Sequence, residues 1–207
     1  FRDLPGTLGH EEILVPAGRV ILADSTNSVS AFYLDRHEVT IGQYEKFLKE
    51  ISAQENWKTF LPPAAAAGKT SLEDLAPPGW KDILQCARKG GKYNGQVTIT
   101  RDTPVFFVDY PSAFAYAKWN KRRLPTKIEW LRAATGNDNR TYPWGNQREA
   151  RGINLGLDLP KNISPESYDH MLPAESHPAD IGPFQHYDLG GNVSEWIASP
   201  NPMTPLF

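Results

Sequence analysis

The sequence contains very little sulfur. It has one cysteine, Cys86, and two methionines in 207 residues. A single cysteine cannot form an internal disulfide, which excludes a fold held together by disulfides within this chain. This cysteine usage is more typical of a reducing compartment than of a secreted, disulfide-rich protein.

The chain also lacks long apolar runs and an excess of either charge. No stretch approaches the roughly 20 apolar residues that a membrane-spanning helix needs, so no membrane span is expected. With 22 basic and 24 acidic residues, the net charge is −2. A nucleic-acid-binding domain usually carries a basic face, so nucleic acid is not expected as a partner. The first residue is Phe1, so we expect a processed or trimmed N-terminus, in which any signal peptide would be invisible.

Aromatic residues, glycine and proline are abundant instead. Aromatic residues make up 11% of the chain, including 6 Trp, and there are 16 Gly and 18 Pro. So many large apolar side chains argue against disorder. The frequent turn residues favour a domain of short elements and long loops over a helical bundle.

The first half of the chain contains recognisable strand and helix patterns. Residues 13–22 predict two short strands about a Pro/Gly turn, and residues 31–35 predict another. Thr40 is a plausible N-cap for a helix, because the residues after it place an apolar stripe at helical spacing. Residues 57–100 are punctuated and irregular, and we interpret them as a long insertion with a short helix near Leu72 and a strand over 97–100.

The second half predicts one strand and two helices. Residues 104–108 read as a buried strand, and Pro111 opens a helix. Thr126 and Glu129 form a capping box at the start of another helix, which Gly136 ends. Residues 137–152 read as a loop. No tandem repeat or linker divides the chain, so we expect one domain over residues 1–207.

Residues 187–196 (YDLGGNVSEW) combine two acidic side chains, an Asn, two glycines and a Trp. Glycine lets the backbone bend so that carbonyl oxygens converge, and carboxylates with carbonyls are the ligands of Ca²⁺. On spacing alone, the segment is either an oxygen-lined cation loop or an Asx-type turn before a strand with a buried Trp. Ser194 has no His or Asp at an interpretable spacing and is not expected to be a nucleophile. Glu38, which follows a strand, is expected to bond the main chain in the core.

Five segments in a fixed order carry a resemblance to a known family. They are residues 32–40 (FYLDRHEVT), 104–119, 123–134, 142–145 (YPWG) and 187–196. Together they resemble the formylglycine-generating enzyme (sulfatase-modifying factor) family, over roughly residues 13 to 198. The resemblance implies an α+β, C-type-lectin-like fold with little regular secondary structure, a small antiparallel sheet, two main helices and long ordered loops.

The resemblance leaves two functions open. Some members are copper-dependent oxidases that convert a substrate cysteine to formylglycine, and others are catalytically silent binding or structural domains. The oxidases bind copper(I) through a cysteine pair near the C-terminus, as the preference of this soft ion for thiolates requires. Cys86 lies in the predicted insertion and matches neither position, and Ala117 stands where many members have a cysteine. We therefore expect these 207 residues to contain neither a copper site nor catalytic residues.

We therefore favour a non-catalytic module that presents loops to a protein, peptide or glycan partner. The alternative is an oxidase whose cysteines lie on a segment beyond Phe207. Because the last residues read as the start of a loop, we expect the missing part of the family fold either to continue the chain or to come from another chain that completes it.

The resemblance also implies two structural Ca²⁺ sites. One would use the side chains of Asp188 and Glu195 with the carbonyls of Leu189, Gly191 and Val193. The other would use the Asn154 side chain, the Leu155 carbonyl, the Asp169 side chain and the Met171 carbonyl, with Asp158 as a rival to Asp169. Two carboxylates and three carbonyls approach the six to eight oxygens that Ca²⁺ takes, and water could complete the shell.

Overall fold

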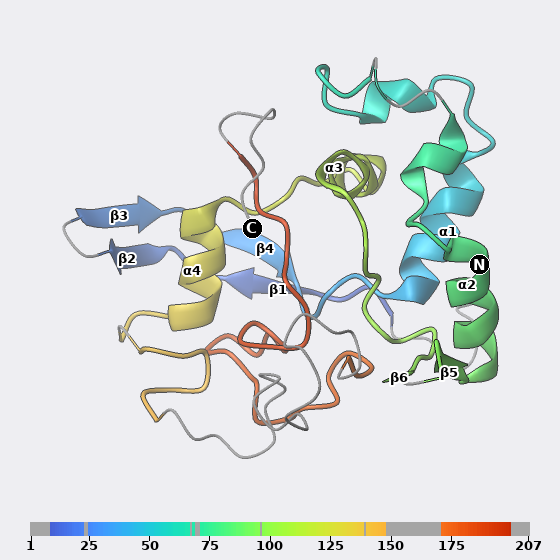
Figure 1. Ribbon diagram of the computed structural model, residues 1–207. Coiled ribbons are helices and arrows are strands. Elements are labelled where there is room, and N and C mark those ends of the chain that lie inside the picture. Colours follow the sequence, from blue (N-terminus) through green and yellow to red (C-terminus); the bar gives the residue numbers. More distant parts are fainter. Residues whose placement is uncertain are drawn as a thin grey trace.

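The computed structural model describes residues 9–22, 25–66, 68, 71–95, 97–138, 140–147 and 171–199. These residues form an α+β structure in which short elements are joined by long loops (Figure 1). The described part contains four α-helices of nine to eleven residues and three two-stranded antiparallel sheets. The predicted α+β class with little regular structure is confirmed, with four helices where two main ones were expected.

The N-terminal strands form two separate pairs. β1 (Glu12–Val15) pairs with β4 (Phe32–Asp35), and β2 (Gly18–Leu22) pairs with β3 (Ser25–Val29). The predicted strands at 13–22 and 31–35 are therefore confirmed, but the first two belong to different sheets. The sequence of β3, Ser-Thr-Asn-Ser-Val, has no apolar alternation that would have predicted a strand.

α1 (Ile41–Ile51) begins at Thr40, as predicted. The Thr40 hydroxyl accepts a hydrogen bond from the Gln43 amide, and the Gln43 side chain accepts one from the Thr40 amide. These reciprocal bonds satisfy main-chain donors that would otherwise lack a partner in the first turn. The helix buries Tyr44, Phe47 and Ile51, and the rings of Tyr44 and Phe47 pack on Tyr116 of α3.

Residues 57–100 contain more structure than the sequence indicated. They form the 3-10 helices η1 (Trp57–Phe60) and η2 (Leu72–Leu75), helix α2 (Trp80–Lys89), and the paired strands β5 (Lys92–Tyr93) and β6 (Val97–Thr98). The predicted helix near Leu72 and strand near 97–100 are confirmed in short form. Helix α2 was missed because Pro77, Pro78 and Gly79 directly before it read as loop punctuation.

The predicted strand over 104–108 is wrong. Pro104 forms only an isolated bridge with Thr40, and Phe107 has a left-handed φ of 60°, which ends any extended run. The helices that follow are confirmed: α3 (Tyr110–Trp119) has Asp109 as its N-cap, and α4 (Lys127–Thr135) has the predicted Thr126–Glu129 capping box and ends at Gly136. The described residues of 137–147 contain no helix or strand, as expected for a loop.

The elements are arranged in two groups with α3 between them (Figure 1). On one side α1 packs against α2, and on the other α4 packs on β2 and β3. The chain over 171–199, coloured orange to red, runs past α4 and passes between α4 and α3 (Figure 1). In the part of the chain that the structure describes, no helix is both long and apolar enough to cross a bilayer.

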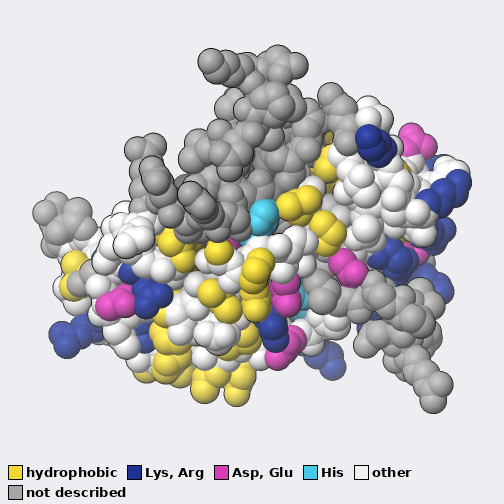
Figure 2. Space-filling view, turned by 90° about the horizontal axis from the view of Figure 1, so that it is seen from below, with side chains coloured by type: hydrophobic (Ala, Val, Ile, Leu, Met, Phe, Trp, Pro, Cys, Tyr) yellow, Lys and Arg dark blue, Asp and Glu magenta, His cyan; other side chains and the backbone are white. Residues whose placement is uncertain are grey.

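Hydrophobic side chains are not confined to the interior. On one face they gather in a patch with lysines and arginines on either side (Figure 2). The large hydrophobic side chains that are exposed among the described residues are Leu14, Ile21, Tyr33, Phe107 and Leu172. Leu14 and Tyr33 lie opposite each other in the β1–β4 ladder, so this sheet carries apolar groups on an exposed face.

Candidate functional site: an acidic pocket beside β4

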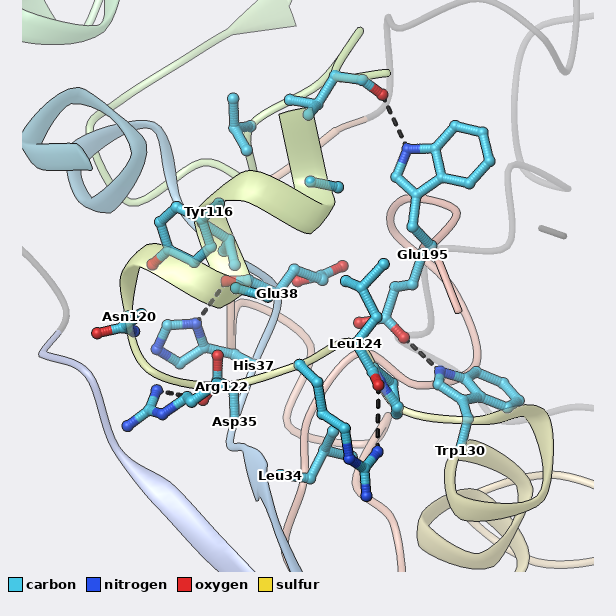
Figure 3. Close-up of a pocket in the computed structure, with 18 of the residues that line it drawn as sticks. Leu34, Asp35, His37, Glu38, Tyr116, Asn120, Arg122, Leu124, Trp130 and Glu195 are labelled. Carbon is cyan, nitrogen blue, oxygen red and sulfur yellow. Dashed lines mark hydrogen bonds and ion pairs between the residues drawn. The ribbon is translucent and has the colours of Figure 1, made fainter. Parts of the chain in front are cut away.

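A cavity of about 370 Å³ opens beside β4 (Figure 3). Its volume lies at the lower end of the range of about 300–1,000 Å³ that is common for ligand pockets. Its lining comes from β4 and the residues after it, from α3, from the segment before α4, and from residues 193–196. Four of the five segments that carry the family resemblance therefore meet at one cavity.

The walls of the cavity are largely apolar and held in place. The Tyr116 ring is buried and stacks on Tyr44, with ring centroids 5.8 Å apart. The Trp196 indole donates a hydrogen bond to the Val108 carbonyl at 2.8 Å and packs edge-on against Tyr110. Because both aromatic rings are fixed by a bond or a stack, these walls do not depend on a ligand for their position.

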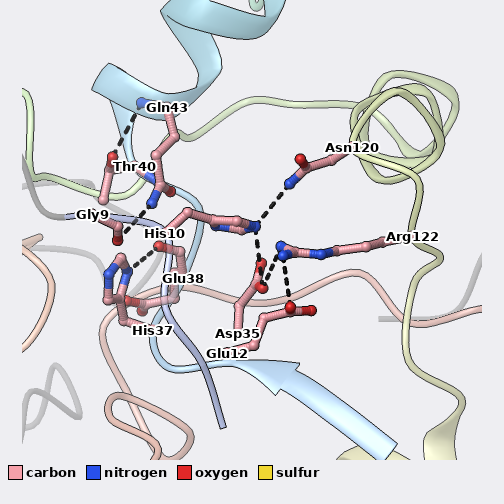
Figure 4. A network of polar contacts seen from close by, with 10 residues as sticks. All are labelled: Gly9, His10, Glu12, Asp35, His37, Glu38, Thr40, Gln43, Asn120 and Arg122. Carbon is pink, nitrogen blue, oxygen red and sulfur yellow. Dashed lines mark hydrogen bonds and ion pairs between the residues drawn. The ribbon is translucent and has the colours of Figure 1, made fainter. Parts of the chain in front are cut away.

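Cations at the rim of the cavity are already paired with acids. Arg122 lies 2.8 Å from Glu12 and 3.0 Å from Asp35 (Figure 4). Arg123 donates to both oxygens of Glu129, at 2.7 and 2.6 Å. Burial raises the pKa of Asp35 to about 6, although the neighbouring Arg122 opposes that shift. Both arginines therefore have carboxylate partners from this chain.

The acids on the inner side of the cavity are not paired in this way. Glu38 is 5% exposed, and neither of its oxygens makes a hydrogen bond of ordinary geometry within the described residues, although Asn192 and Asp188 lie beside it. Burial raises its pKa well above the usual range, and the carboxyls of Asp188 and Glu195 raise it further. Figure 3 shows its side chain pointing toward the side of the cavity where Glu195 lies.

Two more carboxyls share this environment. Glu195 accepts a hydrogen bond from the Trp130 indole, and burial, with a contribution from Asp188, raises its pKa to about 7. Asp188 is 3% exposed and accepts a bond from the Glu175 amide at 2.7 Å, and its pKa is also raised by burial. Within the residues that the structure describes, no ion pair involves Glu38, Asp188 or Glu195. Among the described residues, Glu38 and Glu195 thus line the inner side of the cavity without an ion pair, and Asp188 lies beside them outside the lining.

The structure brings together some of the predicted calcium ligands. Asp188 is close enough to Glu195 to raise its pKa, and both Asp188 and Asn192 have a left-handed φ of 60°, as in a tightly bent loop. The Asn192 side chain bonds both main-chain groups of Leu172, which holds the chain next to Met171 against this loop. The Met171 side chain is itself buried in the core.

The remaining ligands are only partly described. Leu189 packs its side chain into a core cluster, Gly191 and Val193 are partly exposed, and Val193 lines the cavity. Asn154, Leu155, Asp169 and the rival Asp158 lie outside the described residues. Across the described ranges, no three His, Cys, Asp or Glu side chains converge as a metal cage would require. Both calcium sites stay predictions, and the site with Asp188 and Glu195 would take most of its protein ligands from main-chain carbonyl oxygens.

Sequence reasoning missed the position of Glu38. It was expected to bond the main chain. In the structure its side chain is buried and lines the cavity, and its carboxylate makes no hydrogen bond of ordinary geometry to the main chain of the described residues. Its place in the segment 32–40, one of the five that carry the family resemblance, was the available signal. Cys86 lies on α2 beside another core cluster and is not part of the cavity lining.

The fold and the pocket define a loop-rich α+β domain in which four of the five segments that carry the family resemblance line one cavity. The sulfatase-modifying factor enzyme 1-like domain family matches residues 4–205, and this chain belongs to that family. The crystal structure of CarF is similar in fold, with a TM-score of 0.54 over 93% of this chain and 83% of CarF. The two sequences are 17% identical, so this likeness shows the fold alone.

Curated relatives carry three different names. The formylglycine-generating enzyme of Thermomonospora curvata is 30% identical over 187 residues, which cover 84% of this chain and 61% of that enzyme. The inactive C-alpha-formylglycine-generating enzyme 2 of Mus musculus is 30% identical over 83% of this chain and 59% of its own length. The hercynine oxygenase of Mycolicibacterium thermoresistibile is 32% identical over 83% of this chain and 36% of its own length. The chain thus spans less than two thirds of each of these relatives.

Proposed function

We propose that this chain is a binding module of its family and that the cavity beside β4 accepts an extended segment of a partner polypeptide. The observation that supports this most is the cavity itself, which joins apolar walls to an acidic inner side and is lined by four of the family segments. Ligand sites are commonly concave, mostly apolar and supplied with a few polar groups, and this cavity has all three properties.

The edge of β4 supports an extended polypeptide as the occupant. The Arg36 amide donates to the Glu11 carbonyl, and hydrogen-bonded pairs alternate along an antiparallel ladder. The main-chain groups of Tyr33 and Asp35 therefore point away from β1. All four residues of β4 line the cavity, whereas only Glu12 of β1 does. Successive side chains of a strand face opposite ways, so a cavity that is lined by all four residues of β4 reaches the edge of this strand. An extended segment in the cavity could pair with that edge as an added strand.

A copper-dependent oxidase is the second candidate, and it is favoured by the name formylglycine-generating enzyme, which several relatives carry. Such an oxidase would need two thiolates, and these 207 residues contain only Cys86, which is not in the cavity lining. An oxidase would therefore require cysteines from residues outside this sequence. The match to a relative named inactive supports a family role that does not depend on oxidation.

Selection from a random peptide library tests the proposal. We expect the immobilised protein to enrich a set of peptides. The Ala113→Trp variant should not bind these peptides, because Ala113 lines the cavity and a Trp side chain would fill it. Ala53→Trp, at an exposed position after α1, is the matched control and should bind them normally. Peptides that bind the Ala113→Trp variant equally well would contradict a role for the cavity.

The same protein can be assayed for oxidation. It would be incubated with copper(I), oxygen and a cysteine-containing peptide, and the peptide would be analysed by mass spectrometry. We expect the peptide cysteine to remain unmodified. Formation of a formylglycine aldehyde would favour the oxidase over the binding module.

We also propose that Ca²⁺ is held by the Asp188 and Glu195 side chains with the carbonyls of Leu189, Gly191 and Val193. The donor set fits a hard cation, because it joins carboxylates to carbonyls in a loop with left-handed residues. Burial raises the pKa of both Asp188 and Glu195, and neither carboxyl makes an ion pair within the described residues, so a bound cation would supply a counter-charge that these residues do not provide. A cation bound there would stabilise the loop that forms one wall of the cavity.

A further inference from the structure

We propose that Trp144 is a positioning residue for the proposed Ca²⁺ site, because its ring packs on Gly190 and holds the loop whose carbonyls would bind the cation. The inference rests on the proposed function, since it deepens the assignment of Ca²⁺ to Asp188 and Glu195. The family resemblance includes the turn that carries Trp144 but assigns that side chain no role; the role comes from the contacts around Gly190.

The Trp144 ring lies directly against the main chain of Gly190. A Cβ added at Gly190 would lie 2.3 Å from Cζ3 and 3.0 Å from Cη2 of the indole. The closer of these separations is shorter than a real Cβ contact, so a side chain at this position would displace the ring. Gly190 lies between Leu189 and Gly191, two residues whose carbonyls are proposed ligands of the cation. The ring therefore contacts the middle of the proposed cation loop.

The turn that carries Trp144 is held by its own bonds. The main chains of Tyr142 and Gly145 exchange two hydrogen bonds, at 2.9 and 3.0 Å. The Tyr142 ring stacks on the Trp144 ring, with centroids 5.1 Å apart and an angle of 4° between the planes. The Trp144 indole donates a hydrogen bond to the Gln147 carbonyl at 3.0 Å. Because a stack fixes its plane and a hydrogen bond fixes its edge, the ring is a rigid surface on which the cation loop rests.

Asp180 holds the same loop by hydrogen bonds. The Gly190 amide donates to the Asp180 carboxylate, 3.2 Å from each oxygen, and the Asp188 amide donates to the Asp180 carbonyl at 3.0 Å. Asp180 is 1% exposed, so these bonds lie in a surrounding where hydrogen bonds are stronger than in water. The loop is thus fixed at Gly190 by a hydrogen bond as well as by the Trp144 ring.

Two adjacent glycines make this anchoring important for cation binding. Gly190 and Gly191 have no Cβ, and glycine loses more conformational freedom on ordering than any other residue. A loop that is already ordered presents its carbonyls without that loss, whereas a loose loop must be ordered by the cation. Fixing the backbone of one residue is equivalent to about a tenfold change in an equilibrium constant. Removal of the Trp144 ring should therefore weaken Ca²⁺ binding by a factor of this order.

Calorimetric titration of the EGTA-treated and desalted protein with calcium chloride measures this effect. We expect Trp144→Ala to bind Ca²⁺ about tenfold more weakly than the unmodified protein. Trp144→Phe keeps a ring that can stack on Tyr142 and contact Gly190, so it should recover most of the affinity. Trp57→Ala is the matched control, because it removes another partly buried indole, on η1, and should leave the Ca²⁺ affinity unchanged.

Gly190→Ala tests the contact from the side of the loop. The new Cβ would push the Trp144 ring away, so the Ca²⁺ affinity should again fall by about tenfold. In the Trp144→Ala background the same change should cost less than about threefold, because the ring that it displaces is already gone. A loss of equal size in both backgrounds would contradict the role of the ring.

The unmodified protein is the reference for every variant. If it binds no Ca²⁺, the proposed calcium site is overturned, and this inference with it. If it binds Ca²⁺ and Trp144→Ala binds equally tightly, the inference is overturned and the calcium site stands. If Trp144→Ala fails to fold, an unchanged Ca²⁺ affinity of Gly190→Ala would overturn the inference in the same way.

Discussion

A buried arginine explains why Gly18 must be glycine. Arg132 is 0% exposed, donates from Nη2 to the Pro16 carbonyl at 3.1 Å, and lies 4.9 Å from the centre of the Phe184 ring. A Cβ added at Gly18 would lie 2.4 Å from Nη2 and 2.5 Å from Cζ of Arg132. Distances this short force a movement, and a fully buried guanidinium has little room to move.

The Gly18→Ala variant should therefore be less stable. Overpacking of a buried site costs about 1–3 kcal/mol, and the lower entropy of the unfolded alanine chain offsets about 0.4–1 kcal/mol of that. We expect a net loss of about 1–2 kcal/mol in the free energy of unfolding. For a chain of this size, each kcal/mol lowers the melting temperature by about 2–4 °C.

The cause can be isolated with a double-mutant cycle. In an Arg132→Met background the atoms that clash with the new Cβ are gone, so Gly18→Ala should be neutral or slightly stabilising. We expect a coupling energy of about 1–3 kcal/mol from urea denaturation of the four proteins. Gly9→Ala is the control, because its Cβ would meet nothing within 4 Å. Equal effects of Gly18→Ala in both backgrounds would refute the proposed clash.

Three further predictions concern other sites. If Ca²⁺ is structural, EGTA should lower the melting temperature, because a ligand that binds only the folded state stabilises it; Glu195→Gln should abolish this shift, and a melting temperature that ignores EGTA would count against the site. The Arg123 bond, followed by the bonds from Thr126, lowers the pKa of Glu129 from 4.5 to about 2, so its contribution is present above pH 4.5 and is lost as the pH falls toward 2. Glu129→Gln should thus cost about 1 kcal/mol at pH 7 and almost nothing near pH 2, and an equal loss at both pH values would be inconsistent with that pairing. Tyr44→Phe should cost about 1–2 kcal/mol in thermal unfolding, because the Tyr44 hydroxyl donates to the buried Leu75 carbonyl at 2.7 Å, and an unchanged stability would show that this bond contributes nothing.

Local signals in the sequence predicted the ends of elements well. Thr40 was identified as an N-cap from the apolar stripe that follows it, and Thr126 from a capping box with Glu129, which lies only three positions away. Gly136 was identified as a helix end for a similar reason. These features form within one turn of the chain, so no knowledge of the packing was needed.

Signals that depend on packing were less reliable. The run from Val105 to Val108 is apolar enough for a strand, but its backbone turns at Phe107 because the chain leaves the Thr40 bridge to enter α3. Helix α2 lies behind two prolines and a glycine, and its apolar residues Ile83 and Ala87 are buried in a core cluster that also contains Ile41, Ile99 and Phe106. Both outcomes follow from long-range contacts.

The candidate site was partly predictable. The segment that holds Asp188 and Glu195 was singled out because acids, glycines and a Trp are close together in it. The cavity could not be predicted, because its lining joins residues from β4 to Trp196. The lack of an ion pair at Glu38 among the described residues was likewise hidden, since the sequence does not show that Arg122 and Arg123 pair with other acids.

Amide hydrogen exchange of the protein with a selected peptide tests the central claim most directly. If the partner segment adds to the edge of β4 that faces away from β1, the amides of Tyr33 and Asp35 should exchange more slowly in the complex. The Leu34 amide, which already faces β1, should change much less. Slower exchange confined to elements away from β4 would contradict the assignment of this cavity as the binding site.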